Sequence, residues 1–361
     1  MAHAGSIYSL VKIRGNSNFE MITKSISYHF LLVSNYSNLN ALTTLIYQIE
    51  RLHTTYNYCI HVITENQEEI DLLQEKLSRF NLDINFYAFD VNSTGVSSEL
   101  YLEKNGVARI AYSKIFAANI LPLEITKVVY LDTDVLILKD LSMLFKINFS
   151  QSIAACVDSN EGQSDGSPEV FNSGVMVLNL SAIRIKWNLD EVKLAFEENL
   201  VSRWMDMTIL RKLFLDDWFE LPTSFNFIIN GRSQKYYAEE DISIVHFAGH
   251  PKPWTNEVDS VFDIYWRWLN FQAIEEVAAS SPSKNGSFLG EEFLYDVLNR
   301  LYHSLQSGEI ASLRHVSKPK LEATRSELEG IKSSNSWQVL GMYRHIKKLF
   351  LKTFHRHKVV K

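Results

Sequence analysis

Cysteine is scarce in this chain, and long apolar runs are missing. Only 2 of the 361 residues are cysteines, Cys59 and Cys156, and each lies inside an apolar segment. Two distant thiols exclude a disulfide scaffold and fit buried side chains in a reducing compartment. The weakly polar region 28–49 carries repeated Ser and Asn, which excludes it as a membrane span. With 46% apolar residues, the chain can bury the core of one α/β domain with an appendage.

The first residues of the chain lack a signal-peptide pattern, and the last residues lack acidic side chains. Residues 1–27 lack the order of charged and then apolar residues that marks a signal peptide, and we expect a poorly structured leader there. No acidic residue follows Glu329, whereas eight basic residues do, in a chain with a formal charge of −6. An acidic body with a basic tail favours an anionic surface as the tail's partner and gives no sign of a nucleic-acid groove.

Short apolar runs alternate with segments of helical periodicity, which predicts βαβ units and a doubly wound, parallel α/β sheet. The expected strands are 30–33, 58–63, 84–89, 127–131, 153–157, 171–179 and 242–246. The expected helices are 39–49, 66–80, 107–121, 187–200 and 204–215, with a helical pattern again from 258. The segment 159–170 is rich in Ser, Gly and Asp, which predicts a loop that can act as a lid.

A Ser-, Pro- and Gly-containing break at 280–287 predicts the end of the main domain. We therefore expect one domain over 28–280 and a helical extension over 281–361. One apolar stripe runs along the end of this extension, with basic residues on its other faces. It consists of Trp337, Leu340, Tyr343, Ile346, Phe350 and Phe354. Such a basic amphipathic helix suits an anionic membrane surface; the alternative is packing on its own domain or on a second copy.

Two carboxylates interrupt the most apolar segment of the chain. Residues 128–131 form an apolar run, Asp132 and Asp134 follow with one residue between them, and apolar residues resume at Val135. Two unpaired acids are costly to bury, so they need a cation. The carboxyl end of a strand in an open α/β sheet is also where ligands bind. The pattern predicts a D-x-D site that holds a hard divalent cation against phosphate oxygens; the alternative is a strand end with two solvated Asp.

Three residues near the end of the expected domain suit the same site. His246 ends an expected strand, and its neutral imidazole would complete a two-carboxylate, one-histidine site for Mn²⁺, with Mg²⁺ as the alternative. The ammonium group of Lys252 suits a diphosphate leaving group, and Gly249 lets the backbone approach a phosphate closely. The combination fits sugar transfer from a nucleotide sugar, in which the metal is the Lewis acid. Taken singly, His246 could be a core histidine and Lys252 a solvated one.

The chain resembles glycosyltransferase family 8, which includes bacterial lipooligosaccharide galactosyl- and glucosyltransferases and glycogenin. The resemblance spans about residues 28–254 in six segments, of which the H-x-x-G-x-x-K-P-W pattern at 246–254 is the most specific. The segments are Val33-Ser-Asn-Tyr36, Tyr112-Ser-Lys114 through Leu121-Pro122, Val129 to Val135, Phe171-Asn-Ser-Gly-Val175, Asp206 to Leu210, and His246 to Trp254.

This resemblance implies a GT-A fold, a Rossmann-like mixed sheet flanked by helices, and an enzyme that uses a UDP-sugar and Mn²⁺ with retention at the anomeric carbon. It implies metal ligation by Asp132, Asp134 and His246, and a diphosphate held by Gly249 and Lys252. The loop of Val33, Ser34, Asn35 and Tyr36 is expected to contact the uridine, and Lys114 the donor. Asn172 and Asp206 are expected to contact the donor sugar, and Asp158 the acceptor or the reacting sugar. The acceptor would be a saccharide or glycolipid of the bacterial surface. In the tail, Ile331-Lys-Ser-Ser-Asn-Ser-Trp337 followed by Arg344 resembles the short segment that ends many bacterial surface-polysaccharide glycosyltransferases, which favours a cytoplasmic enzyme at the inner face of the membrane.

The chain departs from the family pattern in three places. Met207 stands where several members have a Gln that has been discussed as a nucleophile, so covalent double displacement through this position is disfavoured and a front-face mechanism is preferred. Ser34 stands where an acid is common, which weakens the expected uridine contacts. Lys114 replaces an Arg and so keeps the charge without the bidentate fork.

Two other functions use some of the same residues. A haloacid-dehalogenase-type phosphatase also ends a strand with D-x-D, and Leu215-Asp-Asp217 resembles its distal acid pair, but His246 to Trp254 would then be unexplained. A degenerate, non-catalytic sugar-nucleotide-binding protein would explain Met207 but not the retained acids, His and Lys. The identity of the donor sugar, the acceptor and the oligomeric state are not encoded in any recognisable pattern.

Overall fold

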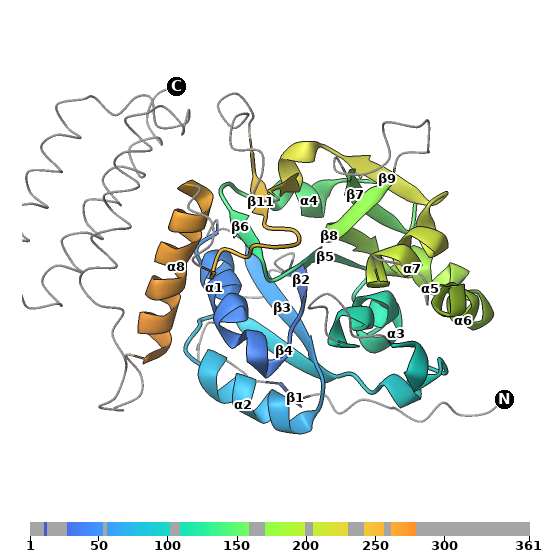
Figure 1. Ribbon diagram of the computed structural model, residues 1–361, viewed down its shortest axis with the longest axis horizontal. Coiled ribbons are helices and arrows are strands. Elements are labelled where there is room, and N and C mark those ends of the chain that lie inside the picture. The colour runs from blue at the N-terminus through green and yellow to red at the C-terminus, as the bar shows by residue number, and fades with distance from the viewer. Residues whose placement is uncertain are drawn as a thin grey trace, which may run out of the picture. The chain divides into compact units, whose positions relative to one another are not determined.

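The computed structural model describes residues 11–12, 27–52, 56–101, 109–158, 170–198, 205–229, 242–255 and 261–278 (Figure 1). Among these, residues up to 229, 242–252 and 269–278 belong to one compact unit, and 253–255 and 261–268 to a second. All residues considered for the site lie in the first unit. The expected lid at 159–169, the linker and the basic tail lie outside the described residues, as does the leader apart from a two-residue strand.

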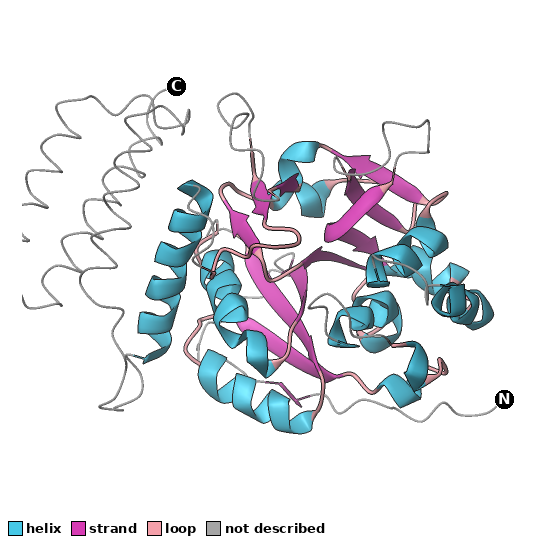
Figure 2. Cartoon of the chain, viewed as in Figure 1, coloured by secondary structure: helices cyan, strands magenta, loops and turns pink. Residues whose placement is uncertain are grey.

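Strands and helices alternate over residues 27–88, and further along the chain several strands or helices follow one another; Figure 2 colours the two kinds of element. The strands are β1 (Val11–Lys12), β2 (Ser27–Val33), β3 (Asn57–Thr64), β4 (Asp83–Ala88), β5 (Lys127–Leu131), β6 (Val135–Ile137), β7 (Ile153–Val157), β8 (Phe171–Asn179), β9 (Trp218–Leu221), β10 (Phe227–Ile228) and β11 (Ile244–His246). The α-helices are α1 (Leu39–Glu50), α2 (Gln67–Leu77), α3 (Ala117–Ile120), α4 (Ser142–Lys146), α5 (Leu180–Lys186), α6 (Leu189–Glu198), α7 (Met205–Phe214) and α8 (Val261–Ala278).

The main sheet has eight strands in the order β1-β4-β3-β2-β5-β8-β7-β9. Strands β4, β3, β2 and β5 are parallel, whereas β8 runs antiparallel to both β5 and β7. The wholly parallel sheet predicted from the alternation of elements is therefore wrong, and the mixed sheet implied by the resemblance is confirmed. Because β7 has the same direction as β5, the residues that follow β2, β5 and β7 lie at one edge together with the start of β8. We call this the carboxyl edge.

Apolar side chains cover both faces of the sheet. On one face, Leu31, Tyr130 and Met176 pack against helices α3, α5, α6 and α7, which Figure 1 shows grouped together. On the other face, Phe145 of α4 stacks on Tyr28 of β2 with ring centroids 4.4 Å apart. The sheet is thus buried on both sides, which leaves its carboxyl edge as the place for polar function.

Helix boundaries follow local capping signals. Asn66 accepts a hydrogen bond from the Glu69 amide (3.0 Å), and α2 begins at the next residue with Ile70, Leu73 and Leu77 facing inward. The side chain of Asn179 caps α5 in the same way, accepting from the Ala182 amide (3.2 Å). A side-chain acceptor at this position satisfies an amide that has no partner within the helix.

Several predicted elements differ from the structure. The segment expected as a helix over 107–121 is a 3-10 helix from Arg109 to Phe116, and only α3 is α-helical. Its apolar pattern is compatible with either helix, so periodicity could not separate them. Strand β9 was not predicted at all, because its pattern is short and contains Glu220. The remaining predicted strands and helices are present with shifted ends.

A second sheet of three strands carries part of the site. Its order is β10-β11-β6, with β11 antiparallel to β6 and parallel to β10. Because β6 follows β5 almost directly, this small sheet brings the end of β11 beside the D-x-D turn. Among the described helices, none combines the length and the apolar character that crossing a membrane requires.

Candidate active site

The two acids of the D-x-D motif lie in the turn between β5 and β6. The amide of Asp132 donates to the carbonyl of Gly174 on β8 (2.8 Å), and the amide of Phe247 donates to the carbonyl of Asp134 (3.0 Å). The backbone of the turn is therefore fixed from both sheets. The Asp132 side chain is 29% exposed and the Asp134 side chain 11%, so the motif opens to solvent at Asp132.

His246 completes a three-residue group with these acids. It lies opposite Val135 in the antiparallel pairing of β11 with β6. Its Nε2 atom is 3.5 Å from Asp134 Oδ1 and 3.7 Å from Asp132 Oδ2. One ligand atom from each of the three residues lies within 4.8 Å of the others. The predicted two-carboxylate, one-histidine group is thus brought together, and its donor set suits a divalent cation.

The orientation of the His246 ring is determined by its neighbours. Asn226 donates from Nδ2 to Asn172 Oδ1 (3.0 Å), so its own Oδ1 is the atom that faces His246 Nδ1 at 2.9 Å. Nδ1 is then the protonated nitrogen, and the lone pair of Nε2 is directed at the two acids. Gly174 lies against the ring, since a Cβ atom there would be 2.1 Å from His246 Cε1.

Lys252 is bound to the site through Asp134. Its Nζ atom forms an ion pair with Asp134 Oδ2 and donates to the carbonyl of Phe247 (2.9 Å). Burial raises the pKa of Asp134, but the positive charge of Lys252 outweighs it and holds the pKa well below its ordinary value. Asp134 is therefore an anion at neutral pH. Lys252, which is predicted to bind a phosphate, contacts the second carboxylate oxygen of Asp134.

A second buried lysine links the D-x-D motif to α7. Lys114 Nζ lies 2.7 Å from Asp206 Oδ2 and 3.4 Å from Asp132 Oδ1. Burial lowers the pKa of Lys114, but the negative charges of Asp132 and Asp206 raise it by more, so the pKa lies well above its usual value. Tyr130 donates its hydroxyl to the same Asp132 oxygen. One buried cation thus pairs with two acids, and the resulting array can hydrogen-bond a polyhydroxyl ligand.

A further polar group lies at the start of β8. Asn172 Nδ2 donates to Asp158 Oδ2 (3.4 Å), and Arg211 of α7 donates to the same oxygen (2.9 Å). Both Asp158 and Asn172 are buried. Through Asn226 this group is connected to His246, so the predicted residues Asn172 and Asp158 belong to one network with the candidate metal group of Asp132, Asp134 and His246. Arg211, Asn226 and Tyr130 were not predicted: Tyr130 lies within the Val129 to Val135 segment and Arg211 directly follows Asp206 to Leu210, but no role was expected for them, and no motif surrounds Asn226.

The predicted uridine loop lies at the carboxyl edge, beside the D-x-D motif. Leu32 pairs with Leu131 in the parallel register of β2 with β5, so Val33 lies level with Asp132. The Ser34 amide donates to the Ile63 carbonyl (3.1 Å), and Ser34 is buried. Acids of α2 and the preceding turn support the half-buried Asn35 and Tyr36: Asn35 Nδ2 donates to Glu65 (3.1 Å) and the Tyr36 amide to Glu69 (3.1 Å).

Gly249 lies between His246 and Lys252 in the loop that follows β11. Its φ of +77° is in the left-handed region, and no atom lies within 4 Å of the position that a Cβ would take. The glycine is thus required by the backbone conformation, and the space over it is open. This is compatible with a ligand that approaches the backbone, as predicted for a phosphate.

Comparison with known proteins agrees with this geometry. The family model for glycosyl transferase family 8 matches residues 11–258. The chain belongs to glycosyltransferase family 8. The transferase is 27% identical over 227 residues to general stress protein A of Bacillus subtilis, covering 55% of this chain and 77% of that protein. It is 28% identical over 195 residues to glycosyltransferase GlyF of Streptococcus pneumoniae, covering 49% of this chain but only 46% of GlyF.

Solved structures show the same fold. A crystal structure of an active-site mutant of LgtC superposes on this transferase with a TM-score of 0.57 and 18% identity, covering 74% of this chain and 99% of LgtC. The glycosyltransferase GlyE of Streptococcus pneumoniae superposes with a TM-score of 0.53 and 18% identity, covering 72% of this chain and 66% of GlyE. The GT-A fold is therefore confirmed. The alternative of a haloacid-dehalogenase-type phosphatase is wrong, because the chain belongs to glycosyltransferase family 8.

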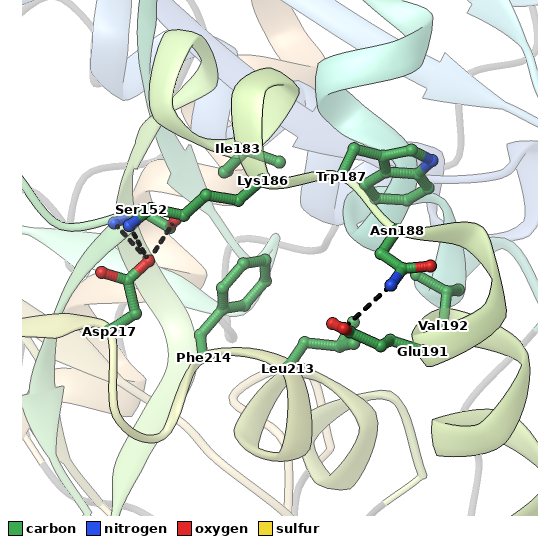
Figure 3. A pocket seen from close by; sticks show the side chains of 10 residues that line it. All are labelled: Ser152, Ile183, Lys186, Trp187, Asn188, Glu191, Val192, Leu213, Phe214 and Asp217. Atoms are coloured by element: carbon green, nitrogen blue, oxygen red, sulfur yellow. Dashed lines mark hydrogen bonds and ion pairs between the residues drawn. The ribbon is translucent and has the colours of Figure 1, made fainter.

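The acid pair that resembled a phosphatase motif lies elsewhere in the transferase. Asp217 directly precedes β9, whose first residue pairs with the first residue of β7 in parallel register. Asp217 thus lies at the edge opposite the D-x-D motif, where it accepts from Ser152 Oγ (2.5 Å) and pairs with Lys186 (2.6 Å). It lines a hollow together with the end of α5 and with α7, shown in Figure 3. None of the predicted site residues lines this hollow.

Asp217→Asn is expected to destabilise the transferase by up to about 1 kcal/mol at pH 7, because the pair with Lys186 is partly exposed. Burial raises the pKa of Asp217, but hydrogen bonds from Lys186 and Ser152 outweigh it and leave the pKa below its ordinary value. A depressed folded-state pKa stabilises above the unfolded value of about 4, and the effect is lost as the pH falls below it. Urea unfolding of both proteins from pH 7 to pH 3.5 measures this difference. A difference that does not shrink toward pH 3.5 contradicts the prediction.

Proposed function

We propose that this transferase moves a hexose, glucose or galactose, from a UDP-sugar to a saccharide or glycolipid acceptor in the synthesis of bacterial surface polysaccharide or lipooligosaccharide. Transfer retains the anomeric configuration and depends on Mn²⁺, with Mg²⁺ as the alternative cation. The observation that supports this best is the group of Asp132, Asp134 and His246, with Lys252 beside it at the carboxyl edge of the sheet.

The three residues fit a divalent cation. Two carboxylates supply anionic oxygen ligands, and Nε2 of His246 is directed at them because Asn226 occupies the other ring nitrogen. Such a mixed oxygen and nitrogen set suits Mn²⁺. When bound, the cation supplies positive charge next to the departing diphosphate. The protein's own part is to hold the three ligands and to keep Asp134 anionic.

The two lysines have separate roles in this proposal. Lys252 donates to a diphosphate oxygen and so stabilises the charge that develops on the leaving group. Its present partner, Asp134, is then free to bind the cation. Lys114 is fixed between Asp132 and Asp206 and lies close to the donor in this proposal. Gly249 lets the backbone approach the diphosphate, and the loop from Val33 to Tyr36 contacts the uridine.

The donor sugar binds between Asn172 and Asp206 in this proposal, and Asp158 faces the acceptor or the reacting sugar. The Asn172 amide and the Asp206 carboxylate hydrogen-bond sugar hydroxyls. Asp158 is buried and paired with Arg211, and it orients an acceptor hydroxyl by accepting its hydrogen bond.

We favour front-face transfer, in which the acceptor attacks on the side from which the diphosphate leaves. Met207 has no nucleophilic group and is 9% exposed. Its neighbour Asp206 is held by Lys114 at 2.7 Å, which fixes the carboxylate and lowers its nucleophilicity. With no free nucleophile at this position, the leaving diphosphate is the base that takes the proton of the acceptor hydroxyl.

The names of two related proteins support hexose transfer to a surface saccharide. The lipopolysaccharide 1,2-glucosyltransferase of Escherichia coli is 28% identical over 171 residues, covering 41% of this chain and 49% of that protein. LgtC is a galactosyltransferase whose structure has been solved with donor and acceptor sugar analogues. An acceptor of this kind is assembled at the inner face of the bacterial membrane, where the transferase would act.

Release of UDP from a panel of UDP-sugars tests the proposal. The protein is incubated with each sugar nucleotide in Mn²⁺, in Mg²⁺ and in chelator. One sugar is expected to give slow UDP release without acceptor, and the release should stop with chelator. No release and no UDP binding by calorimetry across the panel would instead favour the degenerate, non-catalytic protein.

The basic extension gives a separate prediction. We propose that residues 330–361 contact an anionic membrane surface, because they combine eight basic residues with an apolar stripe. Removal of 330–361 is expected to lower co-sedimentation with vesicles rich in anionic lipid by about tenfold and to leave hydrolysis of the sugar nucleotide intact. Vesicles of neutral lipid are the control. Equal binding by the truncated and the full-length chain would assign the extension to protein packing.

A further inference from the structure

A second group of side chains that can bind a metal ion lies on β2 and β3, apart from the candidate active site. His29 is the third residue of β2 and Cys59 the third of β3, and the two pair in the parallel register. His61 is two residues further along β3, on the same face. His61 pairs with Leu31, which pairs with Tyr130, two residues before Asp132, and His29 lies two residues before Leu31 on β2. None of them belongs to the proposed transfer site.

The three side chains converge on one point. His29 Nδ1 lies 3.0 Å from His61 Nε2, and Cys59 Sγ lies 3.6 Å from the same Nε2. One ligand atom from each of the three residues lies within 4.8 Å of the others. Two imidazole nitrogens and a sulfur are the ligands that Zn²⁺ prefers. This is one of two groups of this kind among the described residues, the other being the D-x-D group.

The separations match those between ligands of one tetrahedral ion. With metal–nitrogen distances of about 2.05 Å and a metal–sulfur distance of about 2.3 Å, neighbouring ligands lie about 3.3 Å (nitrogen to nitrogen) and about 3.6 Å (nitrogen to sulfur) apart. The observed 3.0 and 3.6 Å are close to these values. The exposed Asp83 carboxylate lies next to the fourth position, with Oδ2 3.7 Å from Cys59 Sγ.

The surrounding side chains hold the ligand atoms in place. The hydroxyl of Tyr87 lies 2.9 Å from Nδ1 of His61 and fixes the ring so that Nε2 faces the other two residues. Asn85 Nδ2 lies 3.1 Å from Cys59 Sγ and donates to it, which stabilises negative charge on sulfur. Both partners come from β4. Hydrogen bonds of this kind to the ligands are typical of metal sites in proteins.

Both imidazoles are neutral near neutral pH, which ligation requires. Burial lowers the pKa of His61, and the proximity of His29 lowers it further, to about 3. Burial also lowers the pKa of His29, against the opposing effect of Asp83. Neither ring therefore needs to lose a proton in order to bind a cation.

We propose that His29, Cys59 and His61 bind one Zn²⁺ ion that is separate from the cation of the transfer site. The ion ties β2 and β3 together, next to Asp83 of β4, and so stabilises this part of the sheet. Binding releases the thiol proton of Cys59 to solvent, and the fourth position is filled by the Asp83 carboxylate or by water.

Cobalt substitution tests this assignment. The full chain is stripped of metal with a chelator and titrated with Co²⁺, whose thiolate complexes show a charge-transfer absorption in the near ultraviolet. The D-x-D group contains no thiol, so this signal reports only the second site. We expect about one equivalent of Co²⁺ to give the band, and Zn²⁺ to displace it, because zinc binds more tightly than cobalt at such sites.

Variants assign the ligands. Cys59→Ser is expected to lose the band, and His29→Gln to weaken Co²⁺ binding at least about tenfold. Cys156→Ser replaces the other buried cysteine and Asp134→Asn alters the transfer site; both should keep the band. His29 is only half-buried, so His29→Gln decides the question if Cys59→Ser does not fold. The proposal is overturned by the absence of the band in the unmodified chain, by its persistence in Cys59→Ser, or by an unchanged Co²⁺ affinity in His29→Gln.

Discussion

Asp134→Asn is expected to lower turnover of the UDP-sugar by about 10³-fold while the chain remains folded. Asp134 is the most buried acid of the predicted metal group and contacts both His246 and Lys252. The amide keeps the size of the side chain but removes an anionic ligand. A cation that stabilises developing charge contributes several kcal/mol, and a loss of about 4 kcal/mol corresponds to about 10³-fold in rate. Initial rates of UDP release over a range of Mn²⁺ concentrations measure the effect.

Asp71→Asn is the matched control, because it makes the same chemical change at an exposed position of α2. It should have the activity of the unmodified transferase. Thermal unfolding of both variants checks that the loss at Asp134 is not a loss of folding. Turnover by Asp134→Asn within about tenfold of the unmodified protein, at any Mn²⁺ concentration, would contradict the assignment of Asp134 as a metal ligand.

The three residues of the predicted metal group were identified because they are polar side chains within or at the end of an apolar run. Asp132 and Asp134 interrupt an apolar run, and His246 ends one, so their cost of burial points to a ligand. The structure brings these three together. The spacing of the H-x-x-G-x-x-K-P-W segment also placed Lys252 beside them, which its ion pair with Asp134 now shows.

The supporting residues could not be predicted in the same way, because tertiary structure alone brings them to the site. Asn226 contacts His246, which is 20 positions away in the sequence, and Asn172, which is 54 positions away. Nothing near Asn226 in the sequence marks it as more than a turn residue. The direction of β8 is similar: an apolar run fixes that a strand is buried, but not whether it runs parallel or antiparallel to its neighbours.

The type of helix also could not be predicted from the periodicity of the apolar residues. The 3-10 helix from Arg109 to Phe116 buries Lys114 next to Asp206. A regular α-helix was predicted there, and it would distribute the same side chains at a different angular spacing. The role expected for Lys114 depended on the family pattern, not on the helix type, so the residue was found although its local structure was not.

Gly174→Ala is the second substitution with a large expected effect, about 10²-fold on turnover, although Gly174 is not itself a ligand. An added Cβ would lie 2.1 Å from His246 Cε1, so the ring or strand β8 must move. His246 is buried and bonded to Asn226, and movement turns Nε2 away from the acids. Loss of such orienting contacts costs about 10- to 100-fold in metal affinity. The apparent affinity for Mn²⁺, measured from rates, should fall by this factor, and high Mn²⁺ should restore part of the activity.

Gly95→Ala separates a general loss of stability from this effect. Its φ of +79° makes a side chain unfavourable by about 1–2 kcal/mol, and a Cβ there would meet Leu189 Cδ2 at 3.0 Å rather than a site residue. Its Mn²⁺ dependence should be that of the unmodified protein. The double variant Gly174→Ala with His246→Ala gives a further test, because removal of the ring makes room for the Cβ. It should be more stable than Gly174→Ala alone and still inactive, since the clash is relieved but the ligand is gone. If it is instead as active as the unmodified protein, His246 does not bind the metal.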